Sequence, residues 1–383
     1  MLSHSPYNVA RSRMSLNLHD IRWEGFFPAQ GASRDLSEFA HLHRGQSVLV
    51  TGAGGSIGSA LARAICALRP HTLILLDSSE QNLYYVHRDL SSLAGSVRLV
   101  PVLGSVADDI CVGDVFKRFR PHVVYHAAAL KHVPLGEMNP FAVVQNNVVG
   151  TSIVANRAVI ARTERLIMIS TDKSVNPRSI MGASKRLAEM MLQSLTDATT
   201  RMASIRLGNV LGSEGSVVPL FLEQIARGGP VTVADPDVER YFLTMEATVQ
   251  RIFSTAASCP EGAAVAVPVM DEPVKIADLA RFLIAQASKP EIAITYTGLR
   301  PGDKLQEEFV TAYETVTSET SDGIQWVNGP NISAARLITG YANLVAALNE
   351  RNLAKLLDVL TRLVPEYQPS TYLLEQVEAA GNR

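Results

Sequence analysis

Residues 47–58 read SVLVTGAGGSIG, and this stretch decides the fold. A short apolar run ends in a glycine-rich loop, and the helical pattern SALARAICAL follows it. Gly52 permits the tight turn, Gly55 lets the backbone approach a pyrophosphate, and Gly58 lets the helix pack close to the strand. The helix N-terminus offers free N–H groups and partial positive charge to phosphates. The loop residues expected to contact a dinucleotide are Gly52, Gly55, Ser56, Ile57 and Gly58.

The next apolar run, TLILL, ends at an acidic residue, Asp77. A carboxylate at this place accepts hydrogen bonds from a ribose diol but repels a 2′-phosphate. The residues that follow, 78–80, contain no arginine that would hold a phosphate. The sequence therefore predicts NAD as the cofactor in preference to NADP.

Four further apolar runs follow, and helical patterns separate most of them: VRLVPVL, HVVYHAA, RLIMIS and ASIRL. Continuous short apolar runs that alternate with helices indicate a parallel sheet covered on both faces. We therefore expect an α/β fold, a Rossmann-like doubly wound parallel sheet with a smaller C-terminal substrate-binding portion. The expected divisions are an N-terminal arm (1–44), a mainly NAD-binding domain with the catalytic segment (45–206), a mainly substrate-binding portion (207–333) and C-terminal helices (334–383).

Composition excludes several classes of protein. The 383 residues carry a formal net charge of -2, so no basic excess indicates nucleic-acid binding. Three widely spaced cysteines form neither a disulfide framework nor a metal cluster, and we expect no metal and a reducing cytoplasm. No apolar run reaches about 18 residues, which predicts no membrane span. Residues 1–19 are expected to be a poorly ordered arm, and IRWEGFF (21–27) to pack on the main domain or on a partner chain.

The catalytic segment begins at residue 170 and reads STDKSVNPRSIMGASK. Met181 and Lys185 lie four residues apart, so they share one face of the helix expected from about residue 179. Tyr-x-x-x-Lys is the reactive pair of short-chain dehydrogenases, and methionine stands here in place of the tyrosine. A thioether cannot take a proton from a hydroxyl group.

With GAGGSIGS, HAAALKHVPLGEMNP, STDKSVNP, MGASKRLAE, RLGNVLGSEGSVVPLF, RYFLT and RPGDKLQEEF in this order, the chain resembles a bacterial family. The family is that of the UDP-N-acetylglucosamine 4,6-dehydratases of polysaccharide biosynthesis, extended short-chain dehydrogenases. The likeness runs from about residue 45 to about residue 309. Larger members carry membrane helices ahead of this domain, and this chain resembles their catalytic half. The resemblance implies bound NAD, a UDP-N-acetylhexosamine substrate and loss of water across C5 and C6.

The resemblance also implies roles for the catalytic segment. Asp172 would protonate the departing C6 hydroxyl, Lys173 would take the C5 proton, and Thr171 would hydrogen-bond the C4 oxygen. Burial can bring a lysine toward neutrality, which would suit Lys173 as a base. Lys185 would hold the nicotinamide ribose. At Met181 two explanations compete: a lost activity, or a subgroup in which residues 171–173 do the work of the missing base, and we favour the second.

Further contacts follow from the resemblance alone. Ser105, where the family commonly has aspartate, and Val106, Ala127 and Ala128 would line the cofactor. His126 is more simply a structural histidine at a strand end. On the substrate side, Asn147 falls where the family places an asparagine that supports the active-site helix. The substrate contacts expected from the resemblance are Lys131, Asn147, Asn209, Ser216, Val217, Arg240 and Arg300.

We therefore expect a UDP-N-acetylhexosamine 4,6-dehydratase that forms a homo-oligomer. Two alternatives stay open. A C4 epimerase shares the fold and the first hydride step but does not need the Asp172–Lys173 pair. A non-catalytic NAD-binding regulatory protein would have no reason to keep the sugar-nucleotide motifs.

Overall fold

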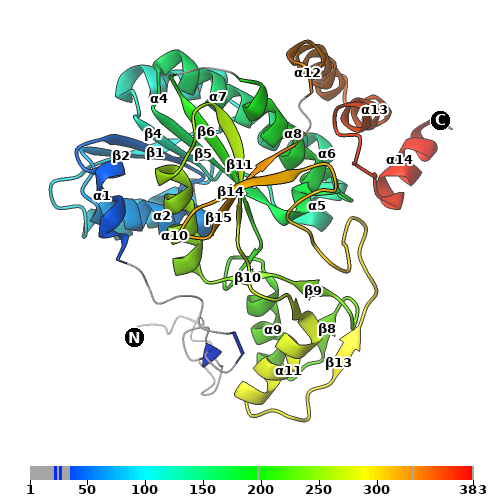
Figure 1. Ribbon diagram of the computed structural model, residues 1–383. Helices are drawn as coiled ribbons and strands as arrows, with labels where there is room; N and C mark the ends of the chain where they lie inside the picture. Colours follow the sequence, from blue (N-terminus) through cyan, green and yellow to red (C-terminus); the bar gives the residue numbers. More distant parts are fainter. Residues whose placement is uncertain (1–20, 24–25, 28–34, 196–198, 330–331, 382–383) are drawn as a thin grey trace, which may run out of the picture.

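A nine-stranded sheet forms the centre of the molecule (Figure 1). The computed structural model describes residues 21–23, 26–27, 35–195, 199–329 and 332–381. The strand order is β14-β15-β11-β6-β5-β4-β1-β2-β3, and the seven strands from β3 to β11 are parallel. The strands are β1 (Ser47–Thr51), β2 (Thr72–Asp77), β3 (Arg98–Leu103), β4 (Val123–His126), β5 (Arg165–Thr171), β6 (Arg201–Leu207), β11 (Ala263–Pro268), β14 (Thr315–Glu319) and β15 (Ile324–Asn328).

The predicted doubly wound sheet is confirmed. The six apolar runs read from the sequence form β1 to β6, and every residue of β1 is buried because helices cover both faces of the sheet. The main flanking helices are α2 (Ser56–Ala67), α3 (Glu80–Ser91), α4 (Asp109–Phe119), α7 (Gly150–Ala161), α8 (Ile180–Ser194) and α10 (Met245–Ala257). Shorter elements are η3 (Leu36–Phe39), α1 (Ala40–His43), α5 (Val133–Met138), α6 (Pro140–Val144), the π-helical η4 (Gln145–Val149) and η5 (Asp172–Ser174).

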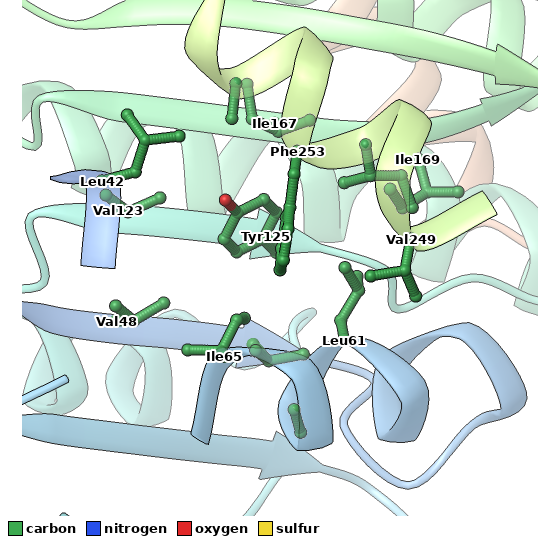
Figure 2. Close-up of a cluster of buried hydrophobic side chains, with 14 of the residues drawn as sticks. Leu42, Val48, Leu61, Ile65, Val123, Tyr125, Ile167, Ile169, Val249 and Phe253 are labelled. Atoms are coloured by element: carbon green, nitrogen blue, oxygen red, sulfur yellow. The ribbon is translucent and has the colours of Figure 1, made fainter. Parts of the chain in front are cut away.

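Successive residues of β1 supply two different cores, as strand geometry requires. Val48 packs with α2 and α10 on one face, in the cluster that Figure 2 shows around Tyr125 and Phe253. Leu49 packs on the opposite face with residues of α4, α7 and α8, including Val112. The carboxyl ends of the parallel strands stay free of these cores, so the loops that follow them can carry a site.

A smaller part lies below the sheet in the view of Figure 1. Its elements are β7 (Asn209–Val210), α9 (Val217–Ala226), β8 (Val231–Val233), β9 (Glu239–Arg240), β10 (Phe242–Leu243), β12 (Val274–Lys275), α11 (Ile276–Gln286) and β13 (Ile294–Tyr296). It has its own apolar core between α9 and α11. Strand β11 and the β14–β15 hairpin bring the chain back to the large sheet. The sheet therefore contains strands from both sides of the division expected at residue 206.

Both ends of the described chain pack on the body of the protein. Trp23 and Phe26 contact the ring of Phe282 on α11, so the described part of the IRWEGFF stretch packs on the smaller part; residues 1–19 lie outside the described residues. The C-terminal helices α12 (Ala334–Asn349), α13 (Leu353–Leu363) and α14 (Thr371–Gly381) share an apolar cluster with α8. Among the described residues, no helix is long and apolar enough to cross a membrane.

Candidate active site

The acidic and basic pair of the catalytic segment lies where β5 ends. Thr171 closes the strand, and Asp172 and Lys173 form the turn η5. The Thr171 hydroxyl donates to Asp172 Oδ1 at 2.8 Å, and Lys173 Nζ donates to the same oxygen at 3.0 Å. Asp172 is fully buried, and its Oδ2 has no hydrogen-bond partner in the described part of the chain. A buried carboxylate oxygen without a partner is costly, so Oδ2 is the natural place for a proton or a ligand hydroxyl.

Lys173 lies between two carboxylates. Its Nζ is 3.4 Å from Oε1 of Glu307, and Oδ1 of Asn209 lies at 3.5 Å. Burial lowers the pKa of Lys173, but the charges of Asp172 and Glu307 outweigh burial and the pKa is raised. The expected shift of the Lys173 pKa toward neutrality is therefore not found. The physical reason is the charge of the adjacent Asp172 together with that of Glu307, which comes from a distant segment.

Met181 and Lys185 share the buried face of α8. Met181 is 4% exposed and packs among apolar residues that include Val133. Lys185 is 3% exposed; burial lowers its pKa to about 8, although Glu189 acts in the opposite direction. The Met181 thioether offers an apolar surface at the position where the Tyr-x-x-x-Lys pair has a tyrosine hydroxyl. Lys185 brings the positive charge to this face.

A buried ion cluster supports the catalytic turn from the interior of the protein. Oε1 of Glu189, on α8, accepts hydrogen bonds from the hydroxyls of Ser170 (2.6 Å) and Ser174 (2.9 Å). Arg206 on β6 bonds both Glu189 (2.8 Å) and Glu314 (2.7 Å) and is fully buried. Sequence reasoning missed this cluster. The available signal was an arginine inside the apolar run ASIRL, facing a glutamate on the helix that carries Lys185.

Asn147 supports the site from inside the protein. Its amide accepts from Leu130 N at 2.9 Å and donates to Leu130 O and to the Ser184 hydroxyl, both at 3.0 Å. The side chain is fully buried, so we correct its place among the substrate contacts: it holds α8 to the segment after β4. His126, between Thr51 and Thr151, is also buried, and burial lowers its pKa to about 3. His126 is neutral and hydrogen-bonded at both ring nitrogens, so its role is structural.

The glycine loop has the shape that a pyrophosphate requires. Gly52 has φ +64, and a Cβ on it would lie 2.7 Å from Ala128 Cα. A Cβ on Gly58 would lie 1.9 Å from Gly52 O, so α2 packs directly against the turn. At Gly55, by contrast, the nearest atom to a Cβ is Gly52 O at 3.4 Å. The loop is therefore open at Gly55, where α2 begins with Ser56 and Ile57 and presents free N–H groups.

Asp77 ends β2 beside this loop. Its two carboxylate oxygens accept from Gly54 N and Ser79 N, each at 2.8 Å, which fixes the orientation of the carboxylate and leaves lone pairs for a ribose hydroxyl. Ser105 and Val106 follow β3, the next strand; the Ser105 hydroxyl accepts from Ala107 N at 3.1 Å. Ala127 and Ala128 follow β4. The cofactor residues expected from the sequence thus lie at the carboxyl ends of adjacent strands.

A loop of the smaller part reaches across the glycine loop. Glu214 N donates to the Ser56 hydroxyl at 3.0 Å, and Gly215 packs against the His132 ring. Ser216 and Val217 begin α9, and the buried Ser216 hydroxyl has no hydrogen-bond partner among the described residues. The loop that precedes α9 therefore contacts the cofactor loop through Glu214, and the substrate contacts expected at Ser216 and Val217 stay a prediction.

The basic residues expected to contact the substrate differ in how freely their side chains can reach a ligand. Arg240 donates to Leu305 O (2.9 Å) and Lys304 O (2.7 Å), so its guanidinium holds a loop and does not present the free fork that we expected for a diphosphate. Arg300 is exposed and pairs with Asp303 at 2.8 Å. Lys131 is exposed as a whole residue, but partial burial of its amine lowers its pKa. The corrected role of Arg240 is structural support for residues 304–305.

The sequence profile described as polysaccharide biosynthesis protein matches residues 48–328. The chain belongs to this family. It is 43% identical over 303 residues to the capsular polysaccharide biosynthesis protein CapD of Staphylococcus aureus (78% of this chain, 50% of CapD). It is 40% identical over 318 residues to the probable polysaccharide biosynthesis protein EpsC of Bacillus subtilis (82% of this chain, 53% of EpsC). The chain spans about half the length of these two relatives.

More distant relatives are sugar-nucleotide enzymes. A UDP-N-acetylglucosamine 4,6-dehydratase (inverting) of Campylobacter jejuni is 28% identical over 281 residues, 71% of this chain and 79% of the relative. Among solved structures, Pen from Bacillus thuringiensis has a TM-score of 0.68 at 26% identity and covers 75% of this chain and 89% of its own. The structure of DesIV from Streptomyces venezuelae, a dTDP-glucose 4,6-dehydratase with NAD bound, shares the fold at a TM-score of 0.60 and 21% identity, over 69% and 88% of the two chains. The predicted family is confirmed.

Proposed function

We propose that this chain is an NAD-dependent 4,6-dehydratase of a UDP-N-acetylhexosamine, most simply UDP-N-acetylglucosamine, for surface polysaccharide or glycan synthesis. The observation that carries the proposal is the acid–base pair on η5. Asp172 is buried with one oxygen shared by Thr171 and Lys173 and the other without a partner. Loss of water from a sugar needs an acid for the leaving hydroxyl beside a base for the C5 proton, and this turn supplies both types of group.

The cofactor fits the residues that are present. The loop is open at Gly55, Asp77 is oriented at the end of β2, and residues 78–80 contain no arginine, which favours a free 2′-hydroxyl. NAD, when bound, supplies a hydride acceptor for C4 and later a hydride donor for C6. Lys185 would hold a ribose hydroxyl and keep positive charge on this face of α8.

The proton of the C4 hydroxyl has a route that avoids Met181. Thr171 Oγ1 already donates to Asp172 Oδ1, so a C4 hydroxyl that donates to Thr171 would pass its proton along this bond. Thr171 ends unchanged and Asp172 becomes a carboxylic acid. Asp172 then gives the same proton to the C6 hydroxyl, which leaves as water. Asp172 takes one proton from the C4 hydroxyl and gives one proton to the C6 hydroxyl, so its protonation state is restored.

Lys173 must be neutral before it can take the C5 proton. Its ammonium is held by two carboxylates, and protonation of Asp172 removes one of these charges. The pKa of Lys173 then falls, and the proton can leave through the partly exposed side of the chain, where 22% of the side chain is accessible. The amine takes the C5 proton and later returns a proton to C5 when hydride reaches C6. Lys173 finally regains an ammonium proton from water.

The test is incubation of the purified protein with UDP-N-acetylglucosamine and NAD in D₂O, followed by mass spectrometry and proton NMR. We expect a 4-keto-6-deoxy product that has lost one water and carries deuterium at C5; the NMR spectrum also gives the C5 configuration. A product of unchanged mass with inverted C4 would instead show an epimerase. Tight NAD binding without any turnover would favour the regulatory alternative.

A further inference from the structure

Glu307 is a buried acidic residue of the RPGDKLQEEF stretch, and the proposed chemistry gives it no step of its own. It lies in the segment between β13 and β14, and its side chain is 2% exposed. A buried carboxylate in a loop is costly unless cations neutralise it, so its partners define what it does.

Three cations from three segments surround this carboxylate. Lys173 Nζ of the catalytic turn lies 3.4 Å from Oε1, and Lys304 Nζ lies 2.9 Å from Oε2. Arg240 Nε of β9 lies 3.9 Å from Oε1. Lys304 also donates to the carbonyl of Val175, just after the catalytic turn, at 2.7 Å. Glu307 thus joins the catalytic turn, β9 and residues 300–310 in one ion cluster.

The charges in this cluster keep Glu307 ionised. Burial alone would raise its pKa, but Lys173, Lys304 and Arg240 outweigh burial and the pKa is lowered. The groups that face Lys173 are Asp172, Glu307 and, as a like charge, Arg240. Glu307 is therefore a fixed negative charge beside Lys173 and not a group that exchanges protons with it.

We propose that Glu307 is a positioning residue for the base: its carboxylate holds the Lys173 ammonium beside Asp172 and ties the acid–base pair to residues 300–310. This inference rests on the proposed function for its catalytic meaning. Asp172 alone, on the adjacent residue, does not fix a lysine side chain with several rotatable bonds, and Glu307 provides a second anchor from another part of the fold. The segment that carries Arg300 is then mechanically joined to the reacting group.

The experiment compares Glu307→Gln and Glu307→Asp with Glu308→Gln in the full chain. Glu308 is the exposed neighbour whose bond from Asn176 at 2.7 Å a glutamine oxygen still accepts, so this control should behave as wild type. The first readout is the pH dependence of Lys173 acetylation by acetic anhydride, followed by mass spectrometry without substrate. We expect Glu307→Gln to lower the labelling midpoint by about one pH unit or more, because one of two carboxylates is lost. In Glu307→Asp, which keeps the carboxylate, the labelling midpoint should stay close to that of wild type.

The second readout is turnover. We expect Glu307→Gln to lower kcat by about 10- to 100-fold with KM changed by less than about threefold, since the base is misplaced while the substrate contacts remain. Partial rescue is expected in Glu307→Asp. A wild-type labelling midpoint in Glu307→Gln overturns the inference whatever the activity. If Glu307→Gln fails to fold, a wild-type kcat in Glu307→Asp, whose carboxylate is drawn back by one methylene, overturns the inference. If wild type makes no 4-keto product, the proposed function fails and labelling alone decides the role of Glu307.

Discussion

Asp172 tests the proposed chemistry at the scale of one residue. Asp172→Asn changes charge and acidity but hardly changes shape, so sugar-nucleotide binding should persist while water loss falls by on the order of 10²–10⁴. Product formation by NMR and binding by calorimetry measure the two effects separately. Asp114→Asn, at an exposed aspartate on α4, is the matched control. Turnover near wild type in Asp172→Asn would remove this residue from the acid role.

Met181 tests whether the base function has moved to the catalytic turn. Met181→Leu nearly conserves volume in a buried apolar site, so most activity should remain. Lys185→Ala should cost much more, because it removes the positive charge on the same helix face. The comparison is 4-keto product formed by wild type, Met181→Leu and Met181→Tyr under the same conditions. A silent wild type with an active tyrosine variant would support the lost-activity explanation instead.

Asp77 tests the choice of cofactor. Its oriented carboxylate accepts from a 2′-hydroxyl and repels a 2′-phosphate, so wild type should bind NAD more tightly than NADP. Asp77→Asn should narrow this preference, chiefly by improving NADP binding. Titration calorimetry with both cofactors measures it. Equal affinities in wild type would contradict the assignment.

The residues of the site were predictable where the chemistry is local in sequence. Asp172 and Lys173 adjoin each other after an apolar run, and the glycine loop precedes a helix, so both could be read directly. The full electrostatic surroundings of Lys173 could not, because its pKa is raised by the adjacent Asp172 and also by Glu307 from a distant segment. Arg240 shows the same limit: its residue type suits a diphosphate, but the carbonyls of residues 304 and 305 take up its donors.

At the scale of elements, the buried cluster of Arg206 sets the relation between β5, β6 and α8. Arg206→Met removes one of the two arginines that pair with both Glu189 and Glu314; the other is Arg186. We expect the variant to lower the free energy of unfolding by about 3–5 kcal/mol. Urea unfolding followed by circular dichroism measures the change. Arg201→Met is the control on the same strand, because its pair with Glu261 is exposed and 3.8 Å long; we expect about 0.5 kcal/mol or less.

The same variant has a pH signature. Burial alone would raise the pKa of Glu189, but Arg206 and Arg186 outweigh burial and lower it from 4.5 to about 2. A carboxyl with a depressed pKa contributes stability above the unfolded value and loses it as pH falls through the folded value. The difference between wild type and Arg206→Met should therefore shrink as pH falls from 4.5 toward 2. A difference that stays constant over this range would show that Arg206 acts through packing alone.

Elements with a buried apolar run were predictable, and those defined by distant pairing were not. Strands β1, β2, β4, β5 and β6 follow continuous apolar runs because both faces of the sheet are covered there, whereas β3 lies at the sheet edge and is partly exposed. Strand β14 reads TVTSE and all five of its residues are exposed, so it has no apolar signal. Its place at the sheet edge comes from pairing with β15, which itself pairs with β11. Hydrogen bonding between distant segments leaves no periodic trace in the sequence.

At the scale of the whole molecule, the candidate site is assembled from loops of both parts of the chain. The glycine loop, residues 127–131 and the catalytic turn follow strands of the large sheet, whereas residues 209–217 and 300–307 come from the smaller part and its return. The two groups already touch, through Glu214 N to Ser56 at 3.0 Å and through Glu307 to Lys173 at 3.4 Å. Cofactor and sugar nucleotide should therefore leave separable footprints that meet at these contacts.

Hydrogen–deuterium exchange of backbone amides, read by mass spectrometry, measures these footprints. NAD alone should slow exchange in residues 52–58 and 127–131, because its pyrophosphate would take up free N–H groups at the start of α2. UDP alone should slow exchange in residues 209–217 and 300–307. Both together should protect the Glu214 and Glu307 contacts more than either ligand does, since each ligand orders one side of the same junction. Helix α13, which packs on α8 and belongs to neither group of loops, is the internal reference. UDP that protects none of residues 209–217 and 300–307 would place the sugar nucleotide elsewhere and separate the NAD site from the proposed chemistry.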